Sequence, residues 1–172
     1  ILLNRESYIG AALSYGKMCD YRKESNIYLG LPIFYNAGLL NVFFSGICSG
    51  SSIIIGPRIS ALNIFSFWDI LLKYNINTTH LTPEIINALC KITTSAESKD
   101  EIKKIQIIST ASYLYNETKE LFEKIYGIRV LNCFGVTEAG GPLTLQAWEH
   151  TYYDHSVGIH SSEIKFKILL ED

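Results

Sequence analysis

Residues 128–141 read IRVLNCFGVTEAGG, and the interpretation of the whole chain starts from this stretch. Three of its first four residues are apolar and two of them are β-branched, which predicts a strand at residues 128–131. The strand is followed by an aromatic ring (Phe134), a glycine (Gly135), a hydroxyl (Thr137) and a carboxylate (Glu138). Ligands of parallel α/β sheets bind where the carboxyl ends of strands meet their loops. The stretch therefore predicts a strand with a ligand-binding turn after it.

Segments typical of strands and helices alternate through the rest of the chain. Short apolar runs predict strands at residues 26–31, 52–55, 77–81 and 105–108, and residues 164–170 alternate as a half-exposed strand does. Helical spacing and end signals predict helices at residues 5–18, 39–47, 64–72, 83–91 and 116–126, with a short capped turn from residue 98. The alternation predicts an α/β fold with a largely parallel sheet covered by helices on both faces.

The bulk composition is that of one soluble globular domain. The chain has 172 residues, of which 48% are hydrophobic and 19% charged, and its formal net charge is −2. A nucleic-acid-binding surface would need clustered lysine and arginine. The basic residues between positions 99 and 104 alternate with acidic ones, which is typical of a solvated helix face. We therefore expect no nucleic-acid partner.

The cysteines and histidines give no sign of a metal site or of disulfides. The four cysteines are scattered and form no C-x-x-C pair, so they are interpreted as buried thiols of a reducing, cytoplasmic environment. His150, His155 and His160 recur every five residues, a spacing that matches neither one helix face nor one strand face. We interpret them as part of a loop.

Residues 27–56 contain no charged residue, which raises the question of a membrane span. Proline, glycine, asparagine and serine interrupt the stretch repeatedly, which favours a buried series of strand, helix and strand. We predict no membrane span. The chain begins with Ile1 and has no signal-like segment there, so we interpret it as a piece of a longer protein.

The side chains after the strand form a possible nucleotide site. The flat ring of Phe134 can stack on a purine, and Gly135 permits close approach of the backbone. Thr137 can donate to a phosphate oxygen, and Glu138 can bind a magnesium ion through its carboxylate. The alternative is a glycine-rich turn with a capping threonine and a solvated glutamate.

The sequence FGVTE closely resembles the Y-G-x-T-E motif of the adenylate-forming superfamily, which includes acyl-CoA synthetases, firefly luciferase and the adenylation domains of peptide synthetases. Other segments resemble that family in the same order: LPIFYNAG resembles L-P-x-F-H-x-x-G, STASYL resembles S-G-A-x-P-L, and SVGI resembles S-V-G-x-P. Residues 50–57 and 67–83 also resemble the family's intervening strand, helix and Thr-Pro turn. The resemblance covers nearly the whole chain.

The resemblance implies an enzyme that uses ATP and Mg²⁺ to activate a carboxylic acid as its acyl-adenylate. Transfer of the acyl group to CoA or to the thiol of a carrier protein would follow. Phe134 is then expected to stack on adenine, Thr137 to contact the α-phosphate and Glu138 to bind magnesium. The remaining nucleotide-binding residues implied are Thr110, Ala111, Ser112, Asn132 and Gly135. The substrate pocket implied consists of Tyr35, Asn36 and Gly38.

Four positions depart from the family pattern. Phe134 replaces a more common tyrosine, Thr110 a glycine, Tyr113 a proline and Tyr35 a histidine. The family's phosphate loop, its catalytic lysine and its ribose-binding aspartate are not in this sequence. The resemblance therefore implies that residues 1–172 are an internal fragment of the layered, AMP-binding N-terminal domain, without phosphate loop, hinge or C-terminal domain. We expect such a fragment to be inactive alone.

Several functional alternatives remain open. The segment around Tyr35 and Asn36 has no acidic residue to pair with a substrate amine, and a buried unpaired ammonium is costly, which favours an acid without a free amine. An adenylation domain for amino acids is the alternative within the family. A non-catalytic interaction module or pseudoenzyme of the same fold is another. A Rossmann dehydrogenase is disfavoured because no G-x-G-x-x-G follows the first strand.

Overall fold

The computed structural model describes residues 2–60, 62–92, 99–147, 155–167 and 169. Its seven strands form one sheet in the order β2-β1-β3-β4-β5-β6-β7. The first five in this order are parallel to one another, whereas β6 pairs antiparallel with β5 and β7 pairs antiparallel with β6. The strands are β1 (Asn26–Leu29), β2 (Ser52–Ile55), β3 (Thr78–Leu81), β4 (Gln106–Ser109), β5 (Val130–Val136), β6 (Gly141–Leu145) and β7 (Ile159–His160).

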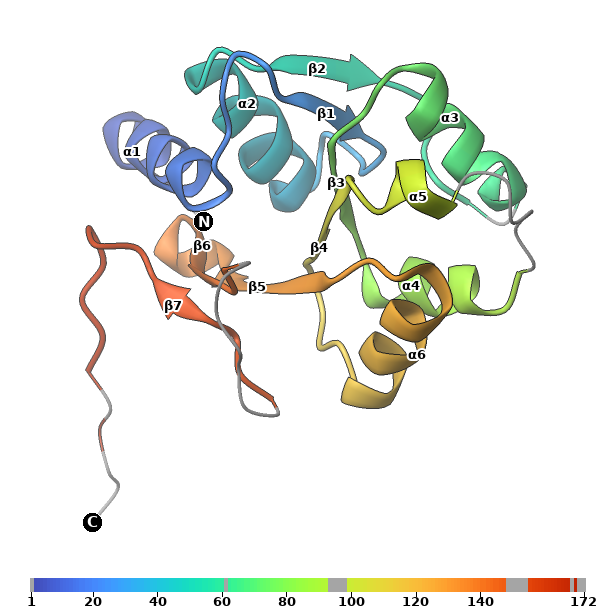
Figure 1. The fold of residues 1–172 in the computed structure, drawn as a ribbon. Helices are drawn as coiled ribbons and strands as arrows, with labels where there is room; N and C mark the ends of the chain where they lie inside the picture. Colours follow the sequence, from blue (N-terminus) through green and yellow to red (C-terminus); the bar gives the residue numbers. More distant parts are fainter. Residues whose placement is uncertain (1, 61, 93–98, 148–154, 168, 170–172) are drawn as a thin grey trace.

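Helices cover both faces of the parallel part, as predicted (Figure 1). One face carries α1 (Arg5–Met18), the π-helix η1 (Ala37–Phe44) and α2 (Ser45–Cys48). The other face carries α3 (Phe67–Lys73), α4 (Pro83–Cys90), α5 (Lys99–Ile102) and α6 (Asn116–Tyr126), with the short 3-10 turn η2 (Ile64–Ser66) leading into α3. The expected α/β fold with a largely parallel sheet is therefore confirmed.

The two faces of the sheet have cores of different character. Beneath α3, α4 and α6 the core is aromatic: the ring of Trp68 lies 4.9 Å from that of Tyr126 and 6.3 Å from that of Phe122. The Tyr126 hydroxyl donates to the Leu89 carbonyl at 2.7 Å, so the phenol is buried with its hydrogen bond made. Beneath α1 and η1 the core includes polar groups.

Local end signals in the sequence explain several helix boundaries. The Asn4 side chain accepts a hydrogen bond from the Glu6 amide at 2.8 Å and caps α1. Gly127 ends α6 with a φ of +67°, which glycine adopts without strain. Pro83 opens α4 as predicted, although the Thr82 side chain makes no capping hydrogen bond.

The helix predicted at residues 39–47 is wider than an α-helix in its first part. The Ser45 amide and hydroxyl both reach the carbonyl of Leu40, five residues earlier, and the α-helix resumes only at Ser45. This stretch is apolar on nearly all sides, so its sequence pattern did not reveal the extra residue in the turn. Single π-helical turns are often found at functional sites.

Two large apolar side chains of the predicted helices lie at the surface. Leu121 is 46% exposed because α6 packs through Phe122 and Tyr126, one turn apart on the neighbouring face. Phe65 is 73% exposed because it lies in the 3-10 turn η2. A 3-10 turn has fewer residues per turn than the following α-helix, so its side chains do not continue the same helix face.

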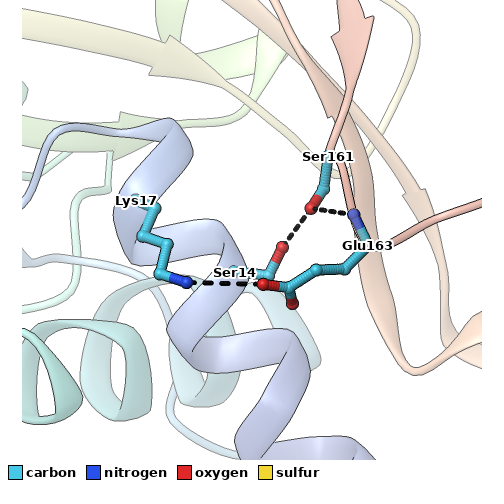
Figure 2. A network of polar contacts seen from close by, with 4 residues as sticks. All are labelled: Ser14, Lys17, Ser161 and Glu163. Atoms are coloured by element: carbon cyan, nitrogen blue, oxygen red, sulfur yellow. Dashed lines mark hydrogen bonds and ion pairs between the residues drawn. The ribbon is translucent and has the colours of Figure 1, made fainter.

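The strand predicted at residues 164–170 does not form over its described residues, 164–167 and 169. Instead, β7 pairs with β6, and the chain then turns onto α1. Figure 2 shows this contact: Ser14 and Ser161 share a buried hydrogen bond, and Lys17 lies 3.4 Å from the Glu163 carboxylate. Attachment to α1 takes the place of sheet pairing.

The uncharged residues 27–56 form most of β1, then η1, α2 and all of β2, as predicted. Of the helices in the described part of the chain, none combines the length and the apolar character needed to cross a bilayer.

His80 lies on β3 beneath α1 and is completely buried. Its Nε2 shares a hydrogen bond of 2.9 Å with the Tyr15 hydroxyl, and Nδ1 has no partner among the described residues. Burial lowers the pKa of His80 from 6.5 to about 3, because the imidazolium would lose its hydration. The ring is therefore neutral in the folded chain at neutral pH.

We expect the free energy of unfolding to fall as the pH is lowered from 6.5 towards about 3. In this range His80 binds a proton in the unfolded chain but not in the folded chain. Protonation therefore favours unfolding by about 1.4 kcal/mol per pH unit. Urea unfolding at pH 7, 6 and 5 measures this slope. His80→Gln should reduce the slope by that amount, and an equal slope in both proteins would show that His80 is not its source.

Candidate functional site

The predicted site residues lie in residues 31–38, 109–114 and 132–141. These segments follow β1, β4 and the parallel part of β5 at one edge of the sheet. Ser109 and Asn132 are register partners at the ends of the parallel β4–β5 pairing. The residues after Ser109 and after Asn132 therefore begin side by side. The loop after β1 leads into η1, which packs against both β1 and β6.

The motif after β5 is part of an antiparallel hairpin. β5 extends to Val136, five residues beyond the predicted end of the strand, and pairs with β6. A register shift lies between Phe134 and Gly135, and a 3-10 turn η4 (Thr137–Ala139) closes the hairpin at Gly140, whose φ is +89°. The sequence suggested a loop here because glycines and a threonine interrupt the apolar run.

Gly135 has a structural explanation within the hairpin. A Cβ at this position would overlap the Gly141 carbonyl oxygen and the Pro142 Cα. The absence of a side chain therefore permits the two strands to approach closely. Approach of a nucleotide to Gly135 stays a prediction, and the hairpin alone is sufficient reason for the glycine.

The hairpin presents the ring, the hydroxyl and the carboxylate to solvent. Phe134 lies opposite Thr144 and is 43% exposed, so its ring is not part of the core. Thr137 and Glu138 are exposed in the turn, and Glu138 forms no ion pair within the described residues. These three groups are accessible to a ligand.

The loop after β4 makes specific contacts at two of its three predicted residues. Thr110 is buried, and its hydroxyl accepts a hydrogen bond of 3.4 Å from the Asn41 amide on η1. The Ser112 hydroxyl donates to the Glu84 carboxylate at 3.2 Å. Hydrogen bonds hold the pKa of the Glu84 carboxyl below its usual value, and the one with the Thr82 side chain contributes most. Asn41 and Glu84 were not predicted, since nothing in their local sequence marks them.

Ala111 is held in the left-handed region with a φ of +86°. A residue with a Cβ is strained there, and such strain is found preferentially at functional sites. The strain is maintained by the anchored residues on either side, Thr110 and Ser112.

The predicted substrate-pocket residues lie at the start of η1. The Asn36 side chain accepts a hydrogen bond of 2.8 Å from the Tyr8 hydroxyl of α1, and its amide nitrogen lies close to Gly141 of the hairpin. Tyr35 is 44% exposed. Gly38 is buried against the Pro32 carbonyl, where a Cβ would overlap. Asn36 therefore joins the pocket loop to α1 and to the hairpin.

Tyr113, at the position of the family's proline, contacts the segment that precedes β7. Its hydroxyl shares a hydrogen bond with His155 Nδ1, and the two rings are stacked with an interplanar angle of 18°. His160 Nδ1 is 2.7 Å from the Ser161 carbonyl. His150 lies outside the described residues.

The described residues contain no cluster of three or more histidine, cysteine, aspartate or glutamate side chains that could hold a metal ion. Glu138 is one exposed carboxylate. Magnesium is commonly bound by one or two protein carboxylates together with phosphate oxygens of a substrate. Glu138 therefore fits a magnesium ion that arrives with a nucleotide, not one held by the protein alone.

A cavity of about 220 Å³ lies away from the turn, between α1 and the strands β6 and β7. Ser14, Lys17, Leu145 and Gln146 contribute to its wall. It contains none of the predicted site residues. The candidate nucleotide surface is instead the open edge formed by the three loops.

Comparisons with known proteins identify relatives over most of the chain. The family described as "AMP-binding enzyme" matches residues 3–172. A curated relative, long-chain fatty acid transport protein 3 of the mouse, is 27% identical over 123 residues, which make up 70% of this chain and 17% of that protein.

Solved structures share the fold at low sequence identity. ATP-bound MatB from Rhodopseudomonas palustris has a TM-score of 0.78 and 18% identity, with 92% of this chain and 30% of that chain covered. The anthranilate CoA ligase AuaEII in complex with anthranoyl-AMP has a TM-score of 0.77 and 12% identity, with 91% and 30% covered. The chain thus spans about a sixth of its curated relative and under a third of these structures.

We expect Ala111→Gly to leave the free energy of unfolding unchanged or to raise it by up to about 1.5 kcal/mol. Removing the Cβ relieves a strain of roughly 1–2 kcal/mol, while the greater freedom of glycine in the unfolded chain offsets about 0.5–1 kcal/mol. Ala88→Gly in α4 is the matched control and should lower stability by about 1 kcal/mol. Denaturant unfolding of both variants measures the difference, and equal losses would contradict a strained Ala111.

Proposed function

This chain belongs to the family of AMP-binding enzymes, and we propose from this membership that its protein activates a carboxylic acid with ATP. The product of this step is an acyl-adenylate. We further propose that a thiol, of CoA or of a carrier protein, then takes the acyl group, so that the enzyme is an acid–thiol ligase. The exposed ring, hydroxyl and carboxylate on the β5–β6 hairpin are the observation that supports the proposal.

Each group of the hairpin has a role in the proposed site. Phe134 stacks on the adenine, whose other side is bordered by the backbone of Thr110, Ala111 and Ser112. Thr137 donates to an oxygen of the α-phosphate. Glu138 ligates the magnesium ion, which would neutralise charge on the phosphates. Asn132 and Gly135 complete the nucleotide surface.

The proposed reaction is a substitution at the α-phosphorus of ATP. A carboxylate oxygen of the acid forms a bond to this phosphorus while the bond between the α-phosphorus and the bridging oxygen breaks, and pyrophosphate leaves. In the second step the thiol forms a bond to the acyl carbon, and AMP leaves with the carboxylate oxygen. The residues of this chain orient the reactants and hold a metal-binding carboxylate in place.

The acid pocket favours a substrate without a free amine. Tyr35, Asn36 and Gly38 border it, and residues 31–38 contain no aspartate or glutamate. Asn36 is already bound to the Tyr8 hydroxyl. An ammonium group would remain unpaired against these residues, so we propose an aromatic or aliphatic carboxylate as the substrate. Activation of amino acids is the alternative outcome.

We propose that residues 1–172 supply only part of the catalytic apparatus, as an internal fragment of an AMP-binding N-terminal domain. The solved structures that share the fold are about three times as long as this chain. A phosphate-binding loop, a ribose-binding aspartate and a catalytic lysine would then come from other parts of the protein. We also propose a cytoplasmic location, which the four free thiols favour.

The contacts of the unusual residues argue against a fold that has lost its site. Thr110 is anchored to Asn41, and Tyr113 is anchored to His155. The substituted residues therefore keep the loop after β4 ordered beside the hairpin. A pseudoenzyme that binds no nucleotide is the competing proposal, and a binding measurement separates the two.

A screen of pyrophosphate release tests the proposed function. We expect the full-length protein, supplied with ATP and Mg²⁺, to release pyrophosphate with aromatic or aliphatic acids and not with amino acids. The isolated 172-residue chain should release none, because the proposed phosphate-binding loop and catalytic lysine would come from other parts of the protein. Release with amino acids alone would refute the substrate class. Absence of release with every acid would favour the pseudoenzyme.

Phe134→Ala should weaken the binding of ATP in the presence of Mg²⁺ by about 5-fold to about 150-fold. Stacking of a base on an aromatic ring contributes roughly 1–3 kcal/mol. Isothermal titration calorimetry of the full-length protein measures the Kd. Phe134→Tyr retains the ring and should bind as the parent does. Phe65→Ala removes another exposed ring, on η2, and serves as the control; an equal effect in it would remove the support for stacking at Phe134.

A further inference from the structure

Gln146 directly follows β6 and uses both ends of its buried side-chain amide. Its Oε1 accepts hydrogen bonds from the Asn132 amide at 3.1 Å and from the Lys119 ammonium at 2.8 Å. Its Nε2 donates to the Ser156 carbonyl at 2.8 Å. One side chain therefore joins β5, α6 and the segment before β7.

The contact with Lys119 adds charge to this network. Lys119 is half-buried on α6, and burial lowers its pKa. A hydrogen bond from an ammonium group is stronger than one between neutral partners. The backbone of Gln146 adds a further contact, because its amide donates to the Asn132 carbonyl at 2.9 Å. Asn132 is thus held at both its N–H and its carbonyl.

Residues 155–158 are fixed against the end of β6 at two further points. The Thr144 hydroxyl donates to the Val157 carbonyl at 2.8 Å. Gly158 has a φ of +88°, and a Cβ there would overlap the backbone of Leu145 and Gln146. The glycine lets this segment pack directly against β6. The position of the segment therefore depends on Gln146 and its neighbours.

The same segment reaches the loop after β4. His155 precedes Ser156, and its ring stacks on Tyr113 and shares a hydrogen bond with the Tyr113 hydroxyl. Tyr113 directly follows Ser112. A continuous path thus runs from Asn132 through Gln146, Ser156 and His155 to this loop.

We propose that Gln146 is a positioning residue of the nucleotide site. Its amide fixes Asn132 and, through Ser156 and His155, sets the position of the loop that carries Thr110, Ala111 and Ser112. The inference rests on the proposed function, which assigns these residues to the nucleotide. Filling the core does not require an amide here, because an apolar side chain of similar size would do so. The amide is needed to hold three separate backbone and side-chain groups in one geometry.

Two substitutions of Gln146 in the full-length protein test the proposal. Gln146→Glu retains an acceptor for Lys119 and Asn132 but places a carboxylate oxygen against the Ser156 carbonyl. Gln146→Met fills a similar volume without hydrogen bonds. Asn77→Asp is the matched control. The Asn77 side chain accepts from the Asn26 amide at 3.0 Å and donates to the Glu24 carbonyl at 3.1 Å, at the amino-terminal ends of β1 and β3.

We expect Gln146→Glu to raise the Kd and the KM for ATP roughly ten-fold, the effect of one lost buried hydrogen bond with an unpaired partner. Gln146→Met loses all three side-chain hydrogen bonds and should raise both at least as much. The kcat should stay within about two-fold of the parent value. Loss of stability alone would reduce the folded fraction and hence the apparent kcat without changing the KM. The Asn77 control should show an unchanged Kd and KM.

Tyr113→Phe supplies a test that does not depend on a buried substitution. It removes the hydroxyl that bonds to His155 from a side chain that is 51% exposed, so the variant should fold. We expect the Kd for ATP to rise roughly three-fold. If the Gln146 variants do not fold, the Kd of the Tyr113→Phe variant for ATP decides whether these contacts position the nucleotide site.

The outcomes separate the inference from the function on which it rests. Folded variants with the parent's Kd and KM for ATP overturn the role of Gln146. A parent that binds ATP but releases no pyrophosphate overturns the proposed reaction, and the binding data still decide on Gln146. A parent that does not bind ATP overturns both.

Discussion

The close approach of Gly135 to Gly141 and Pro142 is the constraint on which the candidate site depends. A Cβ at Gly135 would overlap backbone atoms of the opposite strand. Because the strands can meet there, β5 continues past the edge of the parallel sheet and turns back as β6. This extension carries Phe134 out of the core and presents Thr137 and Glu138 on a tight turn. The exposed positions of these side chains therefore depend on the geometry of the hairpin.

Hydrogen bonds inside the fold hold the loops around this hairpin. Asn41 reaches Thr110 from a π-helical turn, and Asn36 lies between the Tyr8 hydroxyl and the hairpin. Such contacts pair polar groups that burial would otherwise leave unsatisfied. They also give the strained conformation of Ala111 a rigid surrounding. The site is thus built as much by polar residues inside the fold as by those at its surface.

The elements of the fold could be predicted because their signals are local. The helices at residues 5–18 and 116–126 have the predicted bounds, since caps, charge placement and Gly127 act within a few residues. The predictions failed where the residue pattern gives no signal of the conformation. The π-helical turn depends on Leu40, Ser45 and their packing, and the segment after β7 binds α1 instead of extending the sheet.

The sequence by itself determined the alternation of strands and helices, the family resemblance and the residue types at the turn after β5. These follow from side-chain chemistry and from spacing along the chain. Only the tertiary structure decided which of these residues are exposed, that the turn is a hairpin, and that Gln146 and Asn41 support it. Their partners lie 10 or more positions away along the chain. Contacts of this kind depend on how the elements pack, and no local pattern of residues encodes them.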